Sequence, residues 1–177
     1  MSAIALTNVP TTAGNEKSDP ESIDSRSGQL QVVTFRVGDV RLGIKIDHVQ
    51  EINRLTDVTP VPGASAHIHG VVNLRGDVVT IINAHRIFEL PSPEQLSRGR
   101  NLILQFDNER LGVLVDEVTD ILTIHNEELL PRPANLRAVD RRFIHSVCLR
   151  DDNLFVILDA AGLIAAIDES CREKPSA

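Results

Sequence analysis

Alternating apolar and polar residues predict two β-hairpins in the first half of the chain. Residues 29–50 alternate on both sides of a turn at Gly38–Asp39. Residues 68–82 form two apolar runs around Gly76–Asp77, where glycine comes first, as a type II′ turn prefers. Arg75 lies beside this turn as a charged residue at the rim of an apolar strand, and it is either a solvated loop residue or a recognition group.

Short helices follow the apolar strands. Asn83 is a suitable N-cap for a helix over residues 84–88, which the prolines at 91 and 93 end. A longer apolar helix begins after Asp159 and is expected to pack over one half of the domain or to bridge both halves.

Both ends of the chain lack hydrophobic periodicity. Residues 1–28 are polar and are predicted to be a disordered tail, with a partner-binding arm that folds on contact as the alternative. Residues 169–177 are expected to fray. The ordered domain is therefore predicted to span residues 29–168.

A repeat relates the two halves of this domain. Residues 42–52, LGIKIDHVQEI, recur as residues 111–121, LGVLVDEVTDI. Four more short blocks match in the same order, which indicates a duplication with loop insertions between fixed strands. They are 60–62 with 131–133, 68–69 with 144–145, 74–75 with 149–150, and 81–83 with 157–159.

The duplication predicts a mainly β fold. Each half supplies about five strands, and so short a sheet is expected to curl or close into a small barrel, because open edges favour aggregation. Residues 91–100 are polar and turn-rich and separate subdomain one, about 29–90, from subdomain two, about 101–168. A cleft is predicted between the two barrels.

Composition excludes several functional classes. A net charge of −7 and a pI near 5.3 argue against nucleic-acid binding. The apolar stretches are shorter than the roughly 20 residues of a membrane span, and the N-terminus lacks a signal-peptide pattern, so we expect a soluble cytoplasmic protein. The two cysteines, Cys148 and Cys171, are expected to be reduced thiols.

Catalytic and metal-binding patterns are weak. His67, His69 and His85 could supply a metal site, and a metal-dependent enzyme is a remote alternative. His69 matches His145 in the repeat, however, which favours a structural role. Nucleophile-elbow and phosphate-loop motifs are absent from the sequence. The repeated carboxylates are interpreted as strand-end and surface charges, so we expect a binding module without cofactor; these are Asp47, Glu51, Asp116 and Asp120.

Four segments together resemble the CheW family over residues 29–168: 49–52 (VQEI), 69–76 (HGVVNLRG), 79–83 (VTIIN) and 111–116 (LGVLVD). The resemblance implies two five-stranded, SH3-like β-barrels around a cleft. It implies a non-catalytic scaffold in chemotaxis that couples membrane chemoreceptors to the histidine kinase CheA. Two positions depart from the family pattern, Thr80 and Asn83, and they bear on the subfamily more than on the fold.

The resemblance also implies site residues. Arg75, Val49 and Glu51 are expected to bind partners, which are the regulatory domain of a CheA-type kinase and the cytoplasmic hairpin tip of methyl-accepting chemoreceptors. The alternative for Arg75 is an internal ion pair with Glu51. Four neighbours are expected to support the motif: Ile52, Asn73, Leu74 and Gly76.

Two further expectations follow from the resemblance. The protein is expected in receptor arrays at the inner face of the membrane. An alternative is that it serves a chemosensory system for pili or surface motility. Arg150 matches Arg75 only loosely, because Asp151 stands where the first hairpin has glycine, so the role is not transferred to Arg150.

Overall fold

The computed structural model describes residues 28–54, 58–94, 99–137 and 139–172. Of the predicted N-terminal tail, residues 1–27 lie outside the described residues. The prediction that the chain frays from residue 169 is wrong as far as Arg172, because the last helix continues to that residue. Within the described residues, no helix combines the length and the apolar character needed to cross a membrane.

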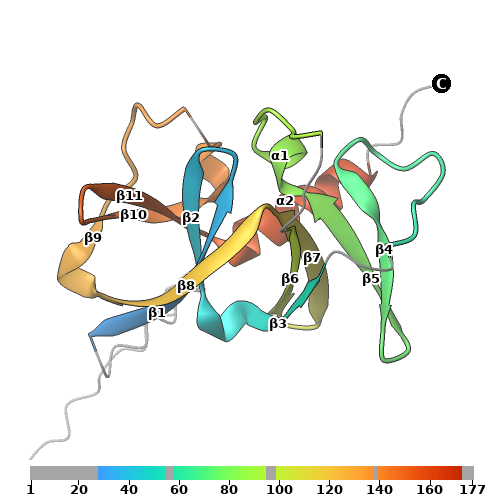
Figure 1. Ribbon diagram of the computed structural model, residues 1–177, viewed down its shortest axis with the longest axis horizontal. Coiled ribbons are helices and arrows are strands. Elements are labelled where there is room, and N and C mark those ends of the chain that lie inside the picture. The colour runs from blue at the N-terminus through green and yellow to red at the C-terminus, as the bar shows by residue number, and fades with distance from the viewer. Residues whose placement is uncertain (1–27, 55–57, 95–98, 138, 173–177) are drawn as a thin grey trace, which may run out of the picture.

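The described chain is mainly β, as predicted (Figure 1). The first half contains β1 (Gln29–Val37), β2 (Val40–Lys45), η1 (Ile46–His48), β3 (Val49–Arg54), β4 (Ile68–Leu74), β5 (Asp77–Asn83) and α1 (Ala84–Ile87). The second half contains β6 (Arg100–Phe106), β7 (Glu109–Val115), β8 (Glu117–His125), η2 (Asn126–Glu128), β9 (Leu129–Leu130), η3 (Arg141–Phe143), β10 (Ile144–Arg150), β11 (Asn153–Leu158) and α2 (Ala160–Arg172). Asn83 caps α1 as predicted, accepting a hydrogen bond from the His85 N–H.

The strands form two sheets that exchange strands between the halves of the chain. Sheet A has the order β8-β1-β2-β11-β10-β9, and sheet B has the order β3-β6-β7-β5-β4. Each sheet therefore combines strands from both halves, and the two sheets lie side by side in Figure 1. The prediction that residues 29–90 and 101–168 form separate barrels is wrong.

Each sheet is curled, and the chain that forms one of its edge strands continues to the opposite edge of the same sheet. In sheet A, β8 is one edge and β9 the other, and the short helix η2 joins them. In sheet B, the chain beyond edge strand β3 reaches the opposite edge, where Thr59 and Val71 exchange two backbone hydrogen bonds of 2.8 Å. In both sheets the two edges are thereby linked, as two five-stranded barrels require.

Two parallel strand pairs join the halves. In sheet A, Gly43 of β2 is paired with Ile157 of β11, and in sheet B, Gly112 of β7 is paired with Ile81 of β5. A Cβ atom on Gly43 would lie 3.0 Å from Ile157 Cδ1, and one on Gly112 would overlap Ile81 Cδ1. The repeated Leu-Gly dipeptide thus exists because a buried isoleucine from the other half occupies the space beside each glycine.

The largest apolar core lies between the sheets. One small cluster is built on sheet A strands and another on sheet B strands, whereas the main cluster draws on both sheets and on α2. Most of the interface where a cleft was predicted is consequently packed. A pocket opens at its margin, between α1, η3 and α2.

We expect Gly112→Ala to reduce the free energy of unfolding by about 1–3 kcal/mol, the usual effect of overpacking a core. Urea denaturation is the measurement. Gly43→Ala is the variant for comparison. It should reduce the free energy of unfolding by less than Gly112→Ala does, because its Cβ has more room.

Ile81→Val removes the Cδ1 atom that Gly112→Ala would strike. The double variant should be more stable than the sum of the two single losses predicts. A neutral Gly112→Ala, or strictly additive losses, would show that this contact does not constrain the fold.

Candidate partner-binding site

The hairpin between β4 and β5 turns one residue earlier than predicted. Leu74 pairs with Asp77, so Arg75 and Gly76 are the two central residues, and both have positive φ angles of 55° and 96°. Two central residues with positive φ define a type I′ turn, so the predicted type II′ turn at Gly76–Asp77 is wrong. Arg75 consequently occupies the first central position of a tight turn, in left-handed backbone geometry.

The second hairpin, β10–β11, has the same turn geometry. Arg150 pairs with Asn153, and the central residues Asp151 and Asp152 have φ angles of 49° and 59°. The structural counterpart of Arg75 is therefore Asp151. The predicted match of residues 74–75 with 149–150 is wrong by one position.

Three residues of the motif shape the turn that carries Arg75. The side-chain oxygen of Asn73 accepts a hydrogen bond of 2.9 Å from the Gly76 N–H. Leu74 packs against the apolar cluster of sheet B, and the positive φ of Gly76 suits glycine. These contacts are of the kind that a supporting role requires.

Arg75 and Glu51 approach each other across the closure of sheet B. Arg75 Nη2 lies 3.6 Å from Glu51 Oε2, and the Arg75 side chain is 89% exposed. The other oxygen of Glu51 accepts a hydrogen bond of 2.7 Å from Asn53 Nδ2. Asn53 was not anticipated as part of the site, although its spacing of two residues from Glu51 on a strand is the signal for a shared face. The internal pair exists, but it is long and exposed.

The nearest carboxylate in the turn does not neutralise Arg75. Asp77 Oδ2 accepts a hydrogen bond of 2.6 Å from Arg110 Nη1 on β7. Among the described residues, Glu51 is the only ion-pair partner recorded for Arg75. Most of its guanidinium donors therefore face solvent.

The other predicted site residues differ in accessibility. Ile52 is 42% exposed on β3, whereas Val49 is half-buried and packs against the core between the sheets. A bulge in the β3–β6 pairing lies between Val49 and Glu51. The structure thus brings Glu51 and Arg75 together and leaves Ile52 on the surface. Val49 is partly buried and contacts the core.

Arg150 provides an internal comparison, because its guanidinium is bonded within sheet A. Its Nη2 donates to both carboxylate oxygens of Glu128, at 2.8 and 3.0 Å, and to the Thr123 carbonyl at 3.1 Å. Glu128 also accepts the His125 N–H. The His125 N–H and then the Arg150 side chain lower the pKa of Glu128 below its usual value. Arg150 holds β10 to the segment that closes the sheet.

Asp116 directly follows β7, as the predicted strand-end charge, but it is not a free surface charge because it pairs with His85 of α1. His85 is buried, and its Nε2 lies 2.5 Å from Asp116 Oδ1. The second oxygen of Asp116 accepts the Gly38 N–H at 2.8 Å, which links α1 to the β1–β2 turn of the other sheet. Within the described part of the chain, no group of three or more His, Cys, Asp or Glu residues is placed to hold a metal ion. His67, His69 and His85 therefore do not form the metal site of the remote alternative.

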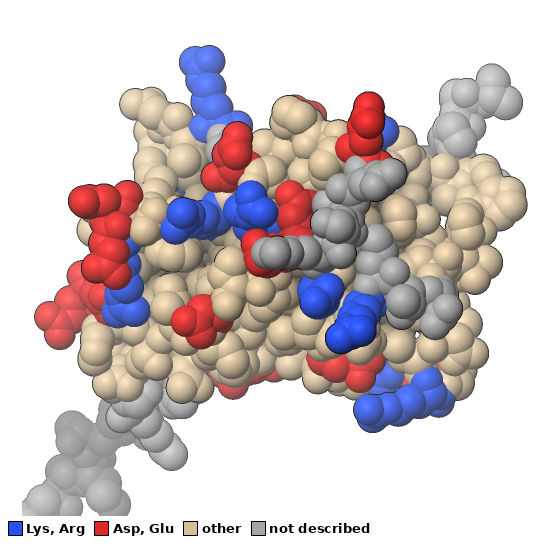
Figure 2. All heavy atoms as spheres, viewed as in Figure 1, with Lys and Arg blue, Asp and Glu red and all other residues tan. Residues whose placement is uncertain are grey.

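Charge is mixed on the visible surface. Figure 2 shows basic and acidic side chains interspersed over one face, without a continuous basic field. This face does not present the basic stripe that binds nucleic acid.

Comparison with known proteins identifies a CheW-like domain over residues 31–168. The chain is 30% identical over 142 residues to the chemotaxis protein CheW of Treponema pallidum, covering 78% of this chain and 84% of that protein. It is 31% identical over 133 residues to chemotaxis protein CheW of Rhizobium meliloti, covering 75% and 86%. Protein FrzA of Myxococcus xanthus is 31% identical over 99 residues, covering 56% and 62%.

The fold agrees with a solved structure. The crystal structure of scaffolding protein TtCheW from Thermoanaerobacter tengcongensis superposes with a TM-score of 0.69 at 23% identity, covering 74% of this chain and 84% of that one. At this identity the likeness shows a shared fold.

We expect Arg75→Ala to change the free energy of unfolding by less than about 0.5 kcal/mol, because exposed ion pairs contribute little. Arg150→Ala should cause a clearly larger loss, since it leaves three hydrogen bonds unmade. Urea denaturation of both variants is the measurement. A loss for Arg75→Ala as large as that for Arg150→Ala would mean that Arg75 is primarily structural.

The effect of Arg150 should also depend on pH. The folded-state pKa of Glu128 lies below 4.5, so its stabilisation is fully present above pH 4.5 and is lost as the pH falls through the folded value. The stability difference between the wild type and Arg150→Ala should therefore shrink in acid. A difference that stays constant from neutral pH to well below pH 4.5 would contradict the assigned ion pair.

Proposed function

The chain belongs to the CheW family, and we propose that it is a non-catalytic adaptor coupling membrane chemoreceptors to a CheA-type histidine kinase in chemotaxis. One observation carries the proposal in this chain: Arg75 is almost fully exposed on a tight turn, and its ion pair with Glu51 is long. The family membership supplies the class of partner.

The geometry of the turn favours recognition. A left-handed backbone is unfavourable for an arginine and would suit glycine or asparagine better, and residues in such conformations are enriched at functional sites. The type I′ turn fixes the backbone, so Arg75 loses less freedom on binding than it would on a loose loop. Its planar guanidinium can donate to carboxylates or carbonyls of a partner in two directions. Glu51, oriented by Asn53, limits the directions that the guanidinium takes.

The receptor contact also needs apolar surface. The tip of a helical hairpin can present apolar side chains to a groove. Ile52 is exposed on β3 beside Glu51, and its repeat counterpart Ile121 on β8 is 52% exposed. We propose that Val49, Glu51, Ile52 and Arg75 contribute to the partner-binding surface of sheet B.

The adaptor would act by changing the relative populations of the active and inactive states of the kinase. It has no need of chemistry of its own, because a protein that binds one kinase state more tightly than another shifts the equilibrium between them. Its proposed place is the cytoplasmic face of the membrane, within receptor arrays, with the regulatory domain of the kinase as second partner. An adaptor in a chemosensory system for pili or surface motility would use the same contacts, and the genes adjacent to this one separate the two alternatives.

Arg75→Glu should leave the fold intact and reduce co-sedimentation with receptor-containing membranes at least tenfold. The substitution removes the guanidinium donors, and the new carboxylate repels a carboxylate of the partner. Arg41→Glu is the matched control, since Arg41 is exposed on β2 of sheet A and the charge change is the same. Circular dichroism and denaturation check the fold.

The outcome separates two roles of Arg75. Receptor binding unchanged by Arg75→Glu would exclude this residue from the interface. Binding reduced equally by Arg41→Glu would indicate only a general effect of charge.

A further inference from the structure

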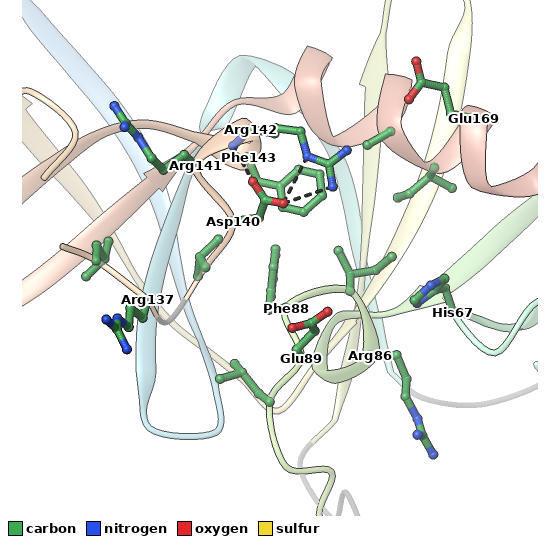
Figure 3. A pocket seen from close by; sticks show the side chains of 16 residues that line it. His67, Arg86, Phe88, Glu89, Arg137, Asp140, Arg141, Arg142, Phe143 and Glu169 are labelled. Carbon is green, nitrogen blue, oxygen red and sulfur yellow. Dashed lines mark hydrogen bonds and ion pairs between the residues drawn. The ribbon is translucent and has the colours of Figure 1, made fainter. Parts of the chain in front are cut away.

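A pocket of about 710 Å³ opens where the two sheets meet, between α1, η3 and α2. Figure 3 shows its lining side chains, which come from these elements, from the residues just after α1, from the loop before η3 and from His67 before β4. None of the residues proposed above for receptor binding lines it. Its volume is within the range of ordinary ligand sites.

The floor of the pocket is apolar and rigid. Phe88 and Phe143 meet edge to face, with ring centroids 6.0 Å apart, and both are buried. Val139 and Ile167 are buried beside them.

The rim carries unused positive charge. Arg137 and Arg141 stand on one side and Arg86 on another, and Figure 3 shows their guanidinium groups at the margin. All three are exposed, and no ion pair is recorded for them among the described residues. Such a concentration is notable in a chain with a net charge of −7.

The remaining charges of the pocket are largely balanced. Arg142 is engaged by Asp140, whose Oδ2 accepts from Arg142 Nε at 3.0 Å, and Glu169 acts on it electrostatically. Glu89 offsets one of the three rim arginines. The pocket therefore keeps a net positive rim.

The short helix η3, which carries Arg141 of the rim, is held in place by contacts to its backbone. Asp140 caps η3 by accepting the Arg142 N–H at 2.9 Å, and Arg132 donates to the Arg141 carbonyl at 3.3 Å. Gly162 of α2 lies so close to the Arg142 carbonyl that a Cβ there would approach it to 2.7 Å. Arg141 is thus presented from an ordered support, which reduces the entropy lost on binding.

We propose that this pocket binds an acidic segment of a partner protein, with one large apolar side chain seated on the Phe88–Phe143 floor and carboxylates at Arg137, Arg141 and Arg86. The position of the arginines favours an extended segment over a small anion, because they stand at separate places on the margin rather than converging on the floor (Figure 3). Backbone N–H groups of such a segment can face Glu89.

The test uses the full chain and a phage-displayed library of random peptides. Panning should yield a consensus with an aromatic or large aliphatic residue flanked by Asp or Glu. A labelled consensus peptide should bind saturably by fluorescence anisotropy. Arg137→Glu and Arg141→Glu should each weaken binding at least tenfold, whereas Arg41→Glu, with the same charge change on an exposed strand position, should change it less than twofold.

Several results would overturn the proposal. They are a consensus without acidic residues, no saturable binding, equal weakening by Arg41→Glu, or displacement of the peptide by free glutamate or inorganic phosphate at comparable concentrations, which would indicate a small-anion site. Arg75→Glu should leave peptide binding unchanged. Because of that control, failure here would leave the receptor proposal standing, and failure of the receptor proposal would not affect this one.

Discussion

The fold depends on the close contact between a glycine and an isoleucine from opposite halves of the chain. Gly43 beside Ile157 and Gly112 beside Ile81 allow two parallel strand pairs to form at short range. These pairs unite β2 with β11 and β7 with β5, so neither half has a complete sheet by itself. The shared apolar core then lies between sheets that each contain strands from both halves. Any change that separates the parallel pairs would affect both sheets together.

This exchange of strands supports the β4–β5 turn, which carries Arg75. Sheet B closes through Thr59 and Val71, and the β4–β5 turn projects beyond that closure with Arg75 at its first central position. Sheet A closes in an equivalent way, but there the arginine next to the turn, Arg150, is bonded to Glu128 and Thr123. Similar scaffolds therefore use an arginine differently. In sheet A the arginine stabilises the closure, and in sheet B it is left exposed, where we propose that it contacts a partner.

The sequence predicts much of the local structure and little of the long-range pairing. Hydrophobic alternation and the Asn83 cap locate the strands and the start of α1, because those signals act between neighbouring residues. A repeat shows which segments are equivalent, but it does not show with which copy each segment pairs, so the strand exchange was missed. The turn was misplaced because a glycine-first rule ignores the possibility of an arginine in left-handed geometry.

The buried His85–Asp116 pair was missed because the two residues are distant in sequence, and each alone looks like an ordinary surface residue. The family likeness pointed to Arg75 and Glu51, but only coordinates show that the pair is long, that Asn53 orients Glu51, and that Asp77 is engaged elsewhere.

The most direct test of the central claim, that sheet B presents Arg75 and its neighbours to a receptor, is a nuclear magnetic resonance titration. The isotopically labelled chain would be titrated with a fragment containing a receptor's cytoplasmic hairpin tip. Chemical-shift changes should concentrate at the amides of residues 49–54 and 73–77. Saturable binding that leaves these amides unchanged and perturbs other surfaces would contradict it.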